Sequence, residues 1–186
     1  MYHIPNDKRA QRSAQRLCQG LLTCLETKEL QAITVSDLHQ ASGVSRATFY
    51  RLFDTVNDVV AYACDTLYDG LAEQLGQNPR VTFQALCVAL IGQWLTLPRL
   101  MEALLKNSMI GLLLQAHTRH GDMLRALSAS AGPLTAAEET YLLCTLVGLL
   151  PIMLQAWYLN GQKDTPEEIY RYLRRCVKLI DQFPDR

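Results

Sequence analysis

Residues 33–53 read ITVSDLHQASGVSRATFYRLF and contain two helix starts in close succession. Thr34, followed three residues later by Asp37, is typical of a capping box that opens a helix. Gly43 can end that helix, because a residue in the left-handed conformation costs least without a Cβ atom. Ser45 can then cap a second helix. The stretch therefore predicts two short helices joined by one tight turn.

The second of these helices has two different faces. At 100° per residue, its core side carries Phe49, Leu52 and Phe53. The other side carries Arg46, Ala47, Tyr50 and Arg51, with Thr48 at its edge, so it offers two cations, a phenol and small groups. This face has no carboxylate, so it can approach phosphates without repulsion and offer arginine to guanine edges. The pattern is typical of a helix-turn-helix that reads DNA, although short capped helices also occur in small helical proteins without that role.

The overall charge gives no support for nucleic-acid binding, because 18 Lys and Arg residues are balanced by 18 Asp and Glu residues. A basic surface must therefore be a local patch. Residues 8–16 contain four cations and no acid, and we predict that Lys8, Arg9 and Arg12 contact the DNA backbone. So few cations predict modest affinity unless two subunits bind together.

The chain has 186 residues, 49% of them hydrophobic, which is enough for one large domain or for a small domain joined to a larger one. Periodicity and caps predict helices at residues 7–27, 55–75, 82–97, 99–125, 135–159 and 165–180, with a junction near 108–111. No segment is a convincing strand. We predict an all-α protein, with a three-helix DNA-binding domain in residues 1–54 joined by a connector helix to a dimerisation and effector-binding domain in residues 55–186.

One stretch resembles a membrane span, since residues 141–159 carry no charge. Gly148 and Pro151 interrupt it, and no cluster of cations flanks it. We therefore favour a buried helix at a subunit interface over a transmembrane helix. Residues 1–16 are polar and do not form a signal peptide. The expected location is the cytoplasm, with no membrane partner.

Candidate ligand and metal sites are sparse. The six cysteines are scattered and are typical of reduced core residues in a cytosolic protein. His117 and His120 could bind a metal only with Asp122, and we expect no metal site and no cofactor. A ligand pocket could include Trp94, Met101, Met109, Leu113, His117 and Trp157, although such residues are more often plain core. No phosphate loop or nucleophile motif is present, so we expect no enzyme.

The N-terminal third of the chain resembles a known protein family. Residues 8–65, and most specifically Thr34-Val35, residues 41–45 and Thr48-Phe49-Tyr50, resemble the DNA-binding domain of the TetR/AcrR family of bacterial transcription regulators. The resemblance implies a homodimer on a palindromic operator, with Ser45, Arg46, Ala47 and Thr48 near bases, Thr34 and Tyr50 at phosphates, and Arg51 at either.

Residues 157–173, WYLNGQKDTPEEIYRYL, look like part of the final helix pair that forms the dimer interface in small family members. The expected interface residues are Leu142, Leu146, Leu149, Met153, Leu173, Val177 and Ile180. The apolar positions of the last helix are Ile169, Tyr172, Leu173, Cys176, Val177 and Ile180.

Two positions depart from the family pattern. Val56 stands where members often have a lysine that reaches phosphate, and Leu52 stands where a polar or aromatic residue is common. Losing one cation per subunit predicts weaker and less salt-sensitive binding. The expected function is a non-catalytic dimeric repressor that a small-molecule effector releases from double-stranded DNA. The alternative is a co-activator or interaction module that keeps the fold and acts through a protein partner.

Overall fold

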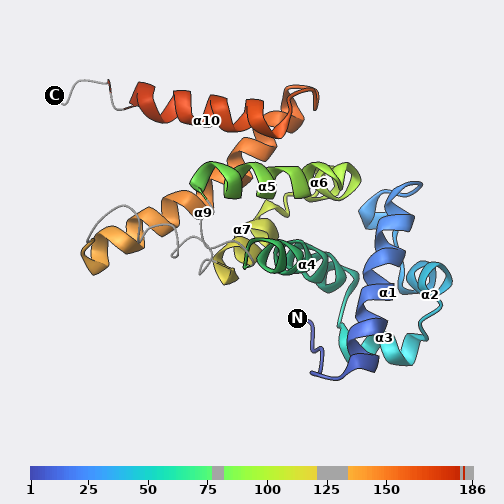
Figure 1. Ribbon diagram of the computed structural model, residues 1–186. Coiled ribbons are helices and arrows are strands. Elements are labelled where there is room, and N and C mark those ends of the chain that lie inside the picture. Colours follow the sequence, from blue (N-terminus) through green and yellow to red (C-terminus); the bar gives the residue numbers. More distant parts are fainter. Residues whose placement is uncertain (77–81, 121–133, 181, 183–186) are drawn as a thin grey trace. The chain divides into compact units, whose positions relative to one another are not determined.

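The computed structural model describes residues 1–76, 82–120, 134–180 and 182 of the chain (Figure 1). Within these ranges the secondary structure is helical, which confirms the predicted all-α class. The α-helices are α1 (Lys8–Leu25), α2 (Val35–Ser42), α3 (Arg46–Leu52), α4 (Val56–Gly76), α5 (Phe83–Leu95), α6 (Pro98–Lys106), α7 (Ile110–Arg119), α9 (Ala136–Leu159) and α10 (Pro166–Ile180), with a short 3-10 helix η1 (Leu30–Ala32).

The chain forms two compact units. Unit 1 comprises residues 1–67 and 97–116, and unit 2 comprises residues 68–96 and 117–186. The predicted DNA-binding segment, residues 1–54, lies entirely in unit 1, together with the start of α4, α6 and most of α7. Compact units and functional domains are different divisions, so the predicted boundary after Asp54 stays a prediction.

In unit 1, α2, α3 and α6 pack against α1 (Figure 1). Helix α1 begins because the Asp7 carboxylate accepts hydrogen bonds from the backbone N–H groups of Arg9 and Ala10, at 2.9 and 2.8 Å. Its buried stripe recurs at three- and four-residue steps and consists of Ala10, Ala14, Leu17, Leu21, Cys24 and Leu25. Helix α6 buries the apolar residues Leu100, Met101, Ala103 and Leu104.

Ion pairs join the end of α1 to α6 within unit 1. Arg99 lies 3.9 Å from Glu26, and Lys106 lies 3.1 Å from Glu29. Both cations also contact Glu102, at 3.0 and 2.8 Å. Because these side chains are exposed, each pair adds little stability, but together they fix α6 relative to the end of α1.

In unit 2, α10 packs against α5 and α9. The rings of Phe83 and Tyr170 lie 6.4 Å apart, and the indole N–H of Trp157 donates a 3.1 Å hydrogen bond to the carbonyl of Asp164. Helix α9 runs through both Gly148 and Pro151, so neither residue ends it. It opens with a capping box formed by Thr135 and Glu138, at the start that the predicted helix of residues 135–159 gives.

The buried face of α10 differs from the predicted stripe. Ile169, Tyr170 and Leu173 are buried, whereas Tyr172 is 41% exposed. The sequence pattern did not include Tyr170, which is buried with Ile169 and Leu173 where α10 packs against α5 and α9.

Helix α9 is long and apolar enough to cross a membrane, with a mean hydropathy of 1.8 over an 18-residue window of which 29% is buried. Large apolar residues are exposed on both final helices of this single chain: Tyr141, Ile152 and Leu159 on α9, and Tyr172, Val177, Leu179 and Ile180 on α10. Whether a second copy covers them stays a prediction.

Candidate nucleic-acid interface

The capping box at the start of α2 is formed as predicted. The Thr34 hydroxyl accepts a 3.2 Å hydrogen bond from the Asp37 N–H, and the Asp37 carboxylate accepts one of 2.9 Å from the Thr34 N–H. Lys28 adds a 2.6 Å contact to that carboxylate. Lys28 and then Thr34 therefore lower the pKa of Asp37 to about 2.

The same contacts affect the predicted role of Thr34. Its hydroxyl also donates a 2.8 Å hydrogen bond to the Asp37 carboxylate. A phosphate contact would need the hydroxyl hydrogen to leave that carboxylate, because a hydroxyl has one hydrogen to donate. In this structure Thr34 therefore caps α2, and its hydroxyl is already hydrogen-bonded to Asp37.

The turn between α2 and α3 depends on Gly43. This residue has φ +66°, and its N–H donates a 2.9 Å hydrogen bond to the carbonyl of His39. A Cβ atom built on Gly43 would lie 2.7 Å from the Arg16 guanidinium. The backbone conformation therefore favours glycine at this position, and a Cβ atom would also displace the end of the Arg16 side chain.

Helix α3 presents the faces that its sequence predicts. Phe49, Leu52 and Phe53 are at most 1% exposed. Thr48 is half-buried, and the other four predicted contacts are exposed: Arg46, Ala47, Tyr50 and Arg51. Ser45 caps the helix by accepting a 3.2 Å hydrogen bond from the Thr48 N–H.

A hollow of about 610 Å³ lies beside this exposed face, within unit 1. It is lined by the first turns of α1, the α2–α3 turn and α3, through Pro5, Asp7, Arg9, Ala10, Arg12, Ser13, Arg16, Gly43, Val44, Ser45, Thr48 and Arg51. Four arginines thus surround it, with Asp7 as the one carboxylate among the lining residues. The hollow therefore has an excess of positive charge, which favours the approach of anions.

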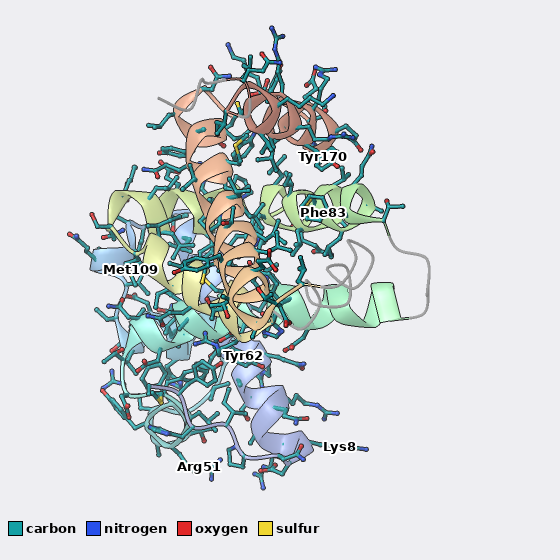
Figure 2. All side chains as sticks on the ribbon, turned by 90° about the vertical axis from the view of Figure 1, so that its left-hand side faces the viewer. Lys8, Arg51, Tyr62, Phe83, Met109 and Tyr170 are labelled. Carbon is teal, nitrogen blue, oxygen red and sulfur yellow. The ribbon has the colours of Figure 1, made fainter. Side chains whose placement is uncertain are left out.

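Two of these arginines show what the tertiary structure adds. Arg16 was not among the predicted contacts, although its spacing of four residues from Arg12 is a signal that could have selected it. Arg51 joins the cations of α1 from the far end of α3. Lys8 does not line the hollow, although Figure 2 shows it at the same end of unit 1 as Arg51.

The N-terminal residues pack on the end of α3, which the sequence did not predict. Tyr2 forms an isolated antiparallel bridge with Phe53, and the His3 N–H donates a 2.8 Å hydrogen bond to the carbonyl of Leu52. The Tyr2 hydroxyl donates one of 2.5 Å to the buried Asp65. These contacts connect the N-terminal residues both to the end of α3 and to the middle of α4.

No lysine or arginine lies in the first turn of α4, residues 56–59, and the cation found there is the Met1 ammonium group, 2.9 Å from Asp58. Val56 is its first residue and is half-buried, and the preceding Thr55 forms a capping box with Asp58. The first turn of α4 therefore offers no lysine side chain to a phosphate.

The predicted ligand-pocket residues belong to two compact units, and the pocket itself stays a prediction. Met101, Met109 and Leu113 belong to unit 1, whereas Trp94 and Trp157 belong to unit 2. Trp94, Met101 and Leu113 are fully buried, and the side chain of His117 lies outside the described part of the structure. Met and aromatic residues serve here mainly as core. Among the described residues, no three His, Cys, Asp or Glu side chains form a metal site.

Unit 2 contains a small apolar cavity of about 20 Å³. Its lining is Phe83, Cys87, Leu90, Ile91, Leu146, Leu149, Leu150, Met153 and Leu173, four of which were predicted for the dimer interface. Burial raises the pKa of the Cys87 thiol to about 12, so the thiol stays neutral. A cavity of this size holds about one water and is too small for a typical effector unless it widens.

Comparison with known proteins supports the fold. No family model matches the chain, and no curated protein sequence matches it. The crystal structure of Lin0861 from Listeria innocua is similar over 96% of both chains, with a TM-score of 0.74 and 14% sequence identity. At this identity the likeness shows a shared all-α fold and says nothing of a shared activity.

Proposed function

We propose that the protein is a DNA-binding transcription regulator of the TetR/AcrR type. The observation that carries the proposal is the position of four arginines, Arg9, Arg12, Arg16 and Arg51, around one hollow beside the exposed face of α3. Phosphates of a DNA strand would occupy the hollow, while Arg46, Ala47 and Tyr50 enter the major groove beside it.

The charges of the site suggest how strong the binding is. If each of the four arginines neutralises one phosphate, one subunit releases about four counterions, and a dimer about eight. The logarithm of the binding constant would then fall with the logarithm of salt concentration with a slope of about −7. Binding by a single subunit would be weak at physiological salt.

A homodimer is therefore part of the proposal. The exposed apolar residues of α9 and α10, such as Ile152, Val177 and Ile180, offer a surface that a second copy would cover. Two copies would place two α3 helices on half-sites one DNA turn, about 34 Å, apart. An effector that favours another spacing would release the DNA, and this requires different affinities for the two states.

The test is fluorescence anisotropy on labelled DNA from the promoter region of the gene itself, with random DNA as competitor. We expect a complex that prefers the promoter fragment and has the steep salt dependence given above. Arg12→Gln should lower that slope by about one for each subunit. Lys163→Gln, which removes an exposed cation from unit 2, is the matched control and should leave binding unchanged. A folded dimer that forms no sequence-preferring complex at low salt would overturn the proposal.

A further inference from the structure

A second hollow, of about 580 Å³, lies between α5 and α10 within unit 2, and the proposed DNA-binding function does not use it. Its lining consists of Gln84, Glu167, Tyr170, Arg171, Arg174, Arg175 and Lys178. The volume lies within the range of small-molecule sites, roughly 300–1,000 Å³. Four cations and one carboxylate, all on α10, thus line a space large enough for a ligand.

The cations form a single stripe. Arg171, Arg174, Arg175 and Lys178 recur at three- and four-residue steps along α10, so they share one face over about 10 Å of helix. Of the four, Arg171 has an acidic neighbour, Glu168, at 3.5 Å. The other three have no acidic partner within 4 Å in the part of the chain that the structure describes. Such a row of like charges is self-repelling, and a bound anion would relieve that repulsion.

Tyr170 supplies an independent observation. Its side chain is 94% buried by its neighbours, since 6% is exposed, and its ring packs on Phe83 at 6.4 Å (Figure 2). It nevertheless lines the hollow, and its hydroxyl has no hydrogen-bond partner among the described residues. The hydroxyl oxygen itself is not among the fully buried atoms, so a ligand in the hollow can reach it. The ring is held rigidly by α5, so this donor stays at the base of the charged stripe.

We propose that this hollow binds a small soluble polyanion with two or more phosphate groups. Arginine matches phosphate oxygens with two parallel hydrogen bonds, and three arginines with one lysine can neutralise about four charges. The stripe is about as long as a chain of three linked phosphates. The Tyr170 hydroxyl and the Gln84 amide would donate to oxygens that the cations leave free. Glu167 at the edge disfavours longer polyanions that would run past the start of α10.

The experiment is isothermal titration of the full chain with inorganic triphosphate at physiological salt. We expect saturable binding at one site per chain. Arg174→Gln with Arg175→Gln should weaken it about tenfold or more, because two charge-assisted contacts are lost. Tyr170→Phe keeps the ring and its packing, and it should weaken binding about threefold to tenfold with an unchanged unfolding temperature. Lys163→Gln should have no effect.

Two results would overturn the proposal. The first is no saturable binding of triphosphate by the folded protein, or an equal loss in Lys163→Gln, which would show attraction by overall charge only. The second is binding of vesicles containing phosphatidylglycerol, sensitive to the arginine pair, without binding of triphosphate, which would assign the stripe to a lipid surface. Light scattering on each variant shows whether its dimerisation is unchanged.

Discussion

The guanidinium of Arg46 donates a 2.5 Å hydrogen bond to the hydroxyl of Ser36, so the first residue of α3 is tied to the first turn of α2. Arginine side chains lose much conformational freedom when they bind, and a partner in the free protein reduces that loss. Arg46 is therefore partly ordered in the free protein, as the proposed DNA contact would require. The hydrogen bond also connects α2 to α3 through the Arg46 side chain.

Replacing Arg46 tests its role in sequence preference. Arg46→Ala should reduce the preference for operator over random DNA by roughly 5- to 150-fold, because a bidentate contact to guanine contributes about 1–3 kcal/mol. Ser36→Ala keeps the guanidinium and is the matched control, which should retain most of the preference. Competition binding with the two DNAs measures both. An equal loss on operator and random DNA for Arg46→Ala would contradict a base contact.

Tyr50 should act on all sequences alike. It is 60% exposed, its ring rests edge-on against Phe49 at 5.2 Å, and its hydroxyl has no partner among the described residues. Tyr50→Phe should weaken binding to operator DNA and to random DNA by the same factor. We expect roughly two- to tenfold, the effect of losing one hydrogen bond to a phosphate. Tyr141→Phe, an exposed tyrosine of unit 2, is the control. A loss confined to the operator would assign Tyr50 to a base instead.

Gly43 should tolerate no side chain. Gly43→Ala should lower the free energy of unfolding by about 1–2 kcal/mol, because alanine resists φ +66° and its Cβ would displace Arg16. Gly70→Ala is an instructive control, since Gly70 is exposed within α4 and a Cβ there meets no atom within 4 Å. That change should raise stability by about 0.5–1 kcal/mol. Urea denaturation compares them, and equal stabilities for the two variants would refute this account of the turn.

Asp37 makes the stability depend on pH. Its pKa in the folded protein is about 2, below its usual value of 3.8, so the unfolded chain takes up the proton first as the pH falls. The stability that the carboxylate contributes is complete above about pH 5 and is lost between about pH 4 and pH 2. The urea midpoints of the unmodified protein and of Asp37→Asn should therefore differ by a constant amount near neutral pH. This difference should become smaller below about pH 4.

Lys28 provides the control for that measurement. Its hydrogen bond is the largest cause of the lowered pKa, so Lys28→Gln should move the loss of stability to higher pH. If the difference in urea midpoint between the unmodified protein and Asp37→Asn is the same at pH 3 and pH 6, the pKa of Asp37 is not lowered by folding.

The proposed dimer can be tested on α10. Val177 is 49% exposed in the single chain, so Val177→Glu should leave the fold intact. In an apolar interface the unpaired charge would cost on the order of several kcal/mol, enough to give monomers at micromolar concentration. Lys163→Glu changes charge outside these apolar residues and should remain dimeric. Light scattering measures the mass, and an unchanged dimer for Val177→Glu would place the contact elsewhere.

Much of unit 1 could be predicted because its signals are local. The caps at Thr34 and Ser45 and the left-handed Gly43 each depend on residues within one helical turn. The apolar side of α3 follows from periodicity alone. In α10 the same reasoning failed for Tyr170, because periodicity gives a stripe but not the direction from which α5 and α9 approach it.

The sequence by itself determined the all-α class, the helix-turn-helix and the exposed face of α3, since these follow from backbone preferences and side-chain spacing over a few residues. Only the tertiary structure decided which charges meet. Arg16 and Arg51 lie on different helices and line one hollow because α1 and α3 pack together, and Tyr170 joins the cations of α10 because α5 packs against its ring. Contacts of this kind depend on packing between segments that are distant in the sequence, and no local sequence pattern specifies that packing.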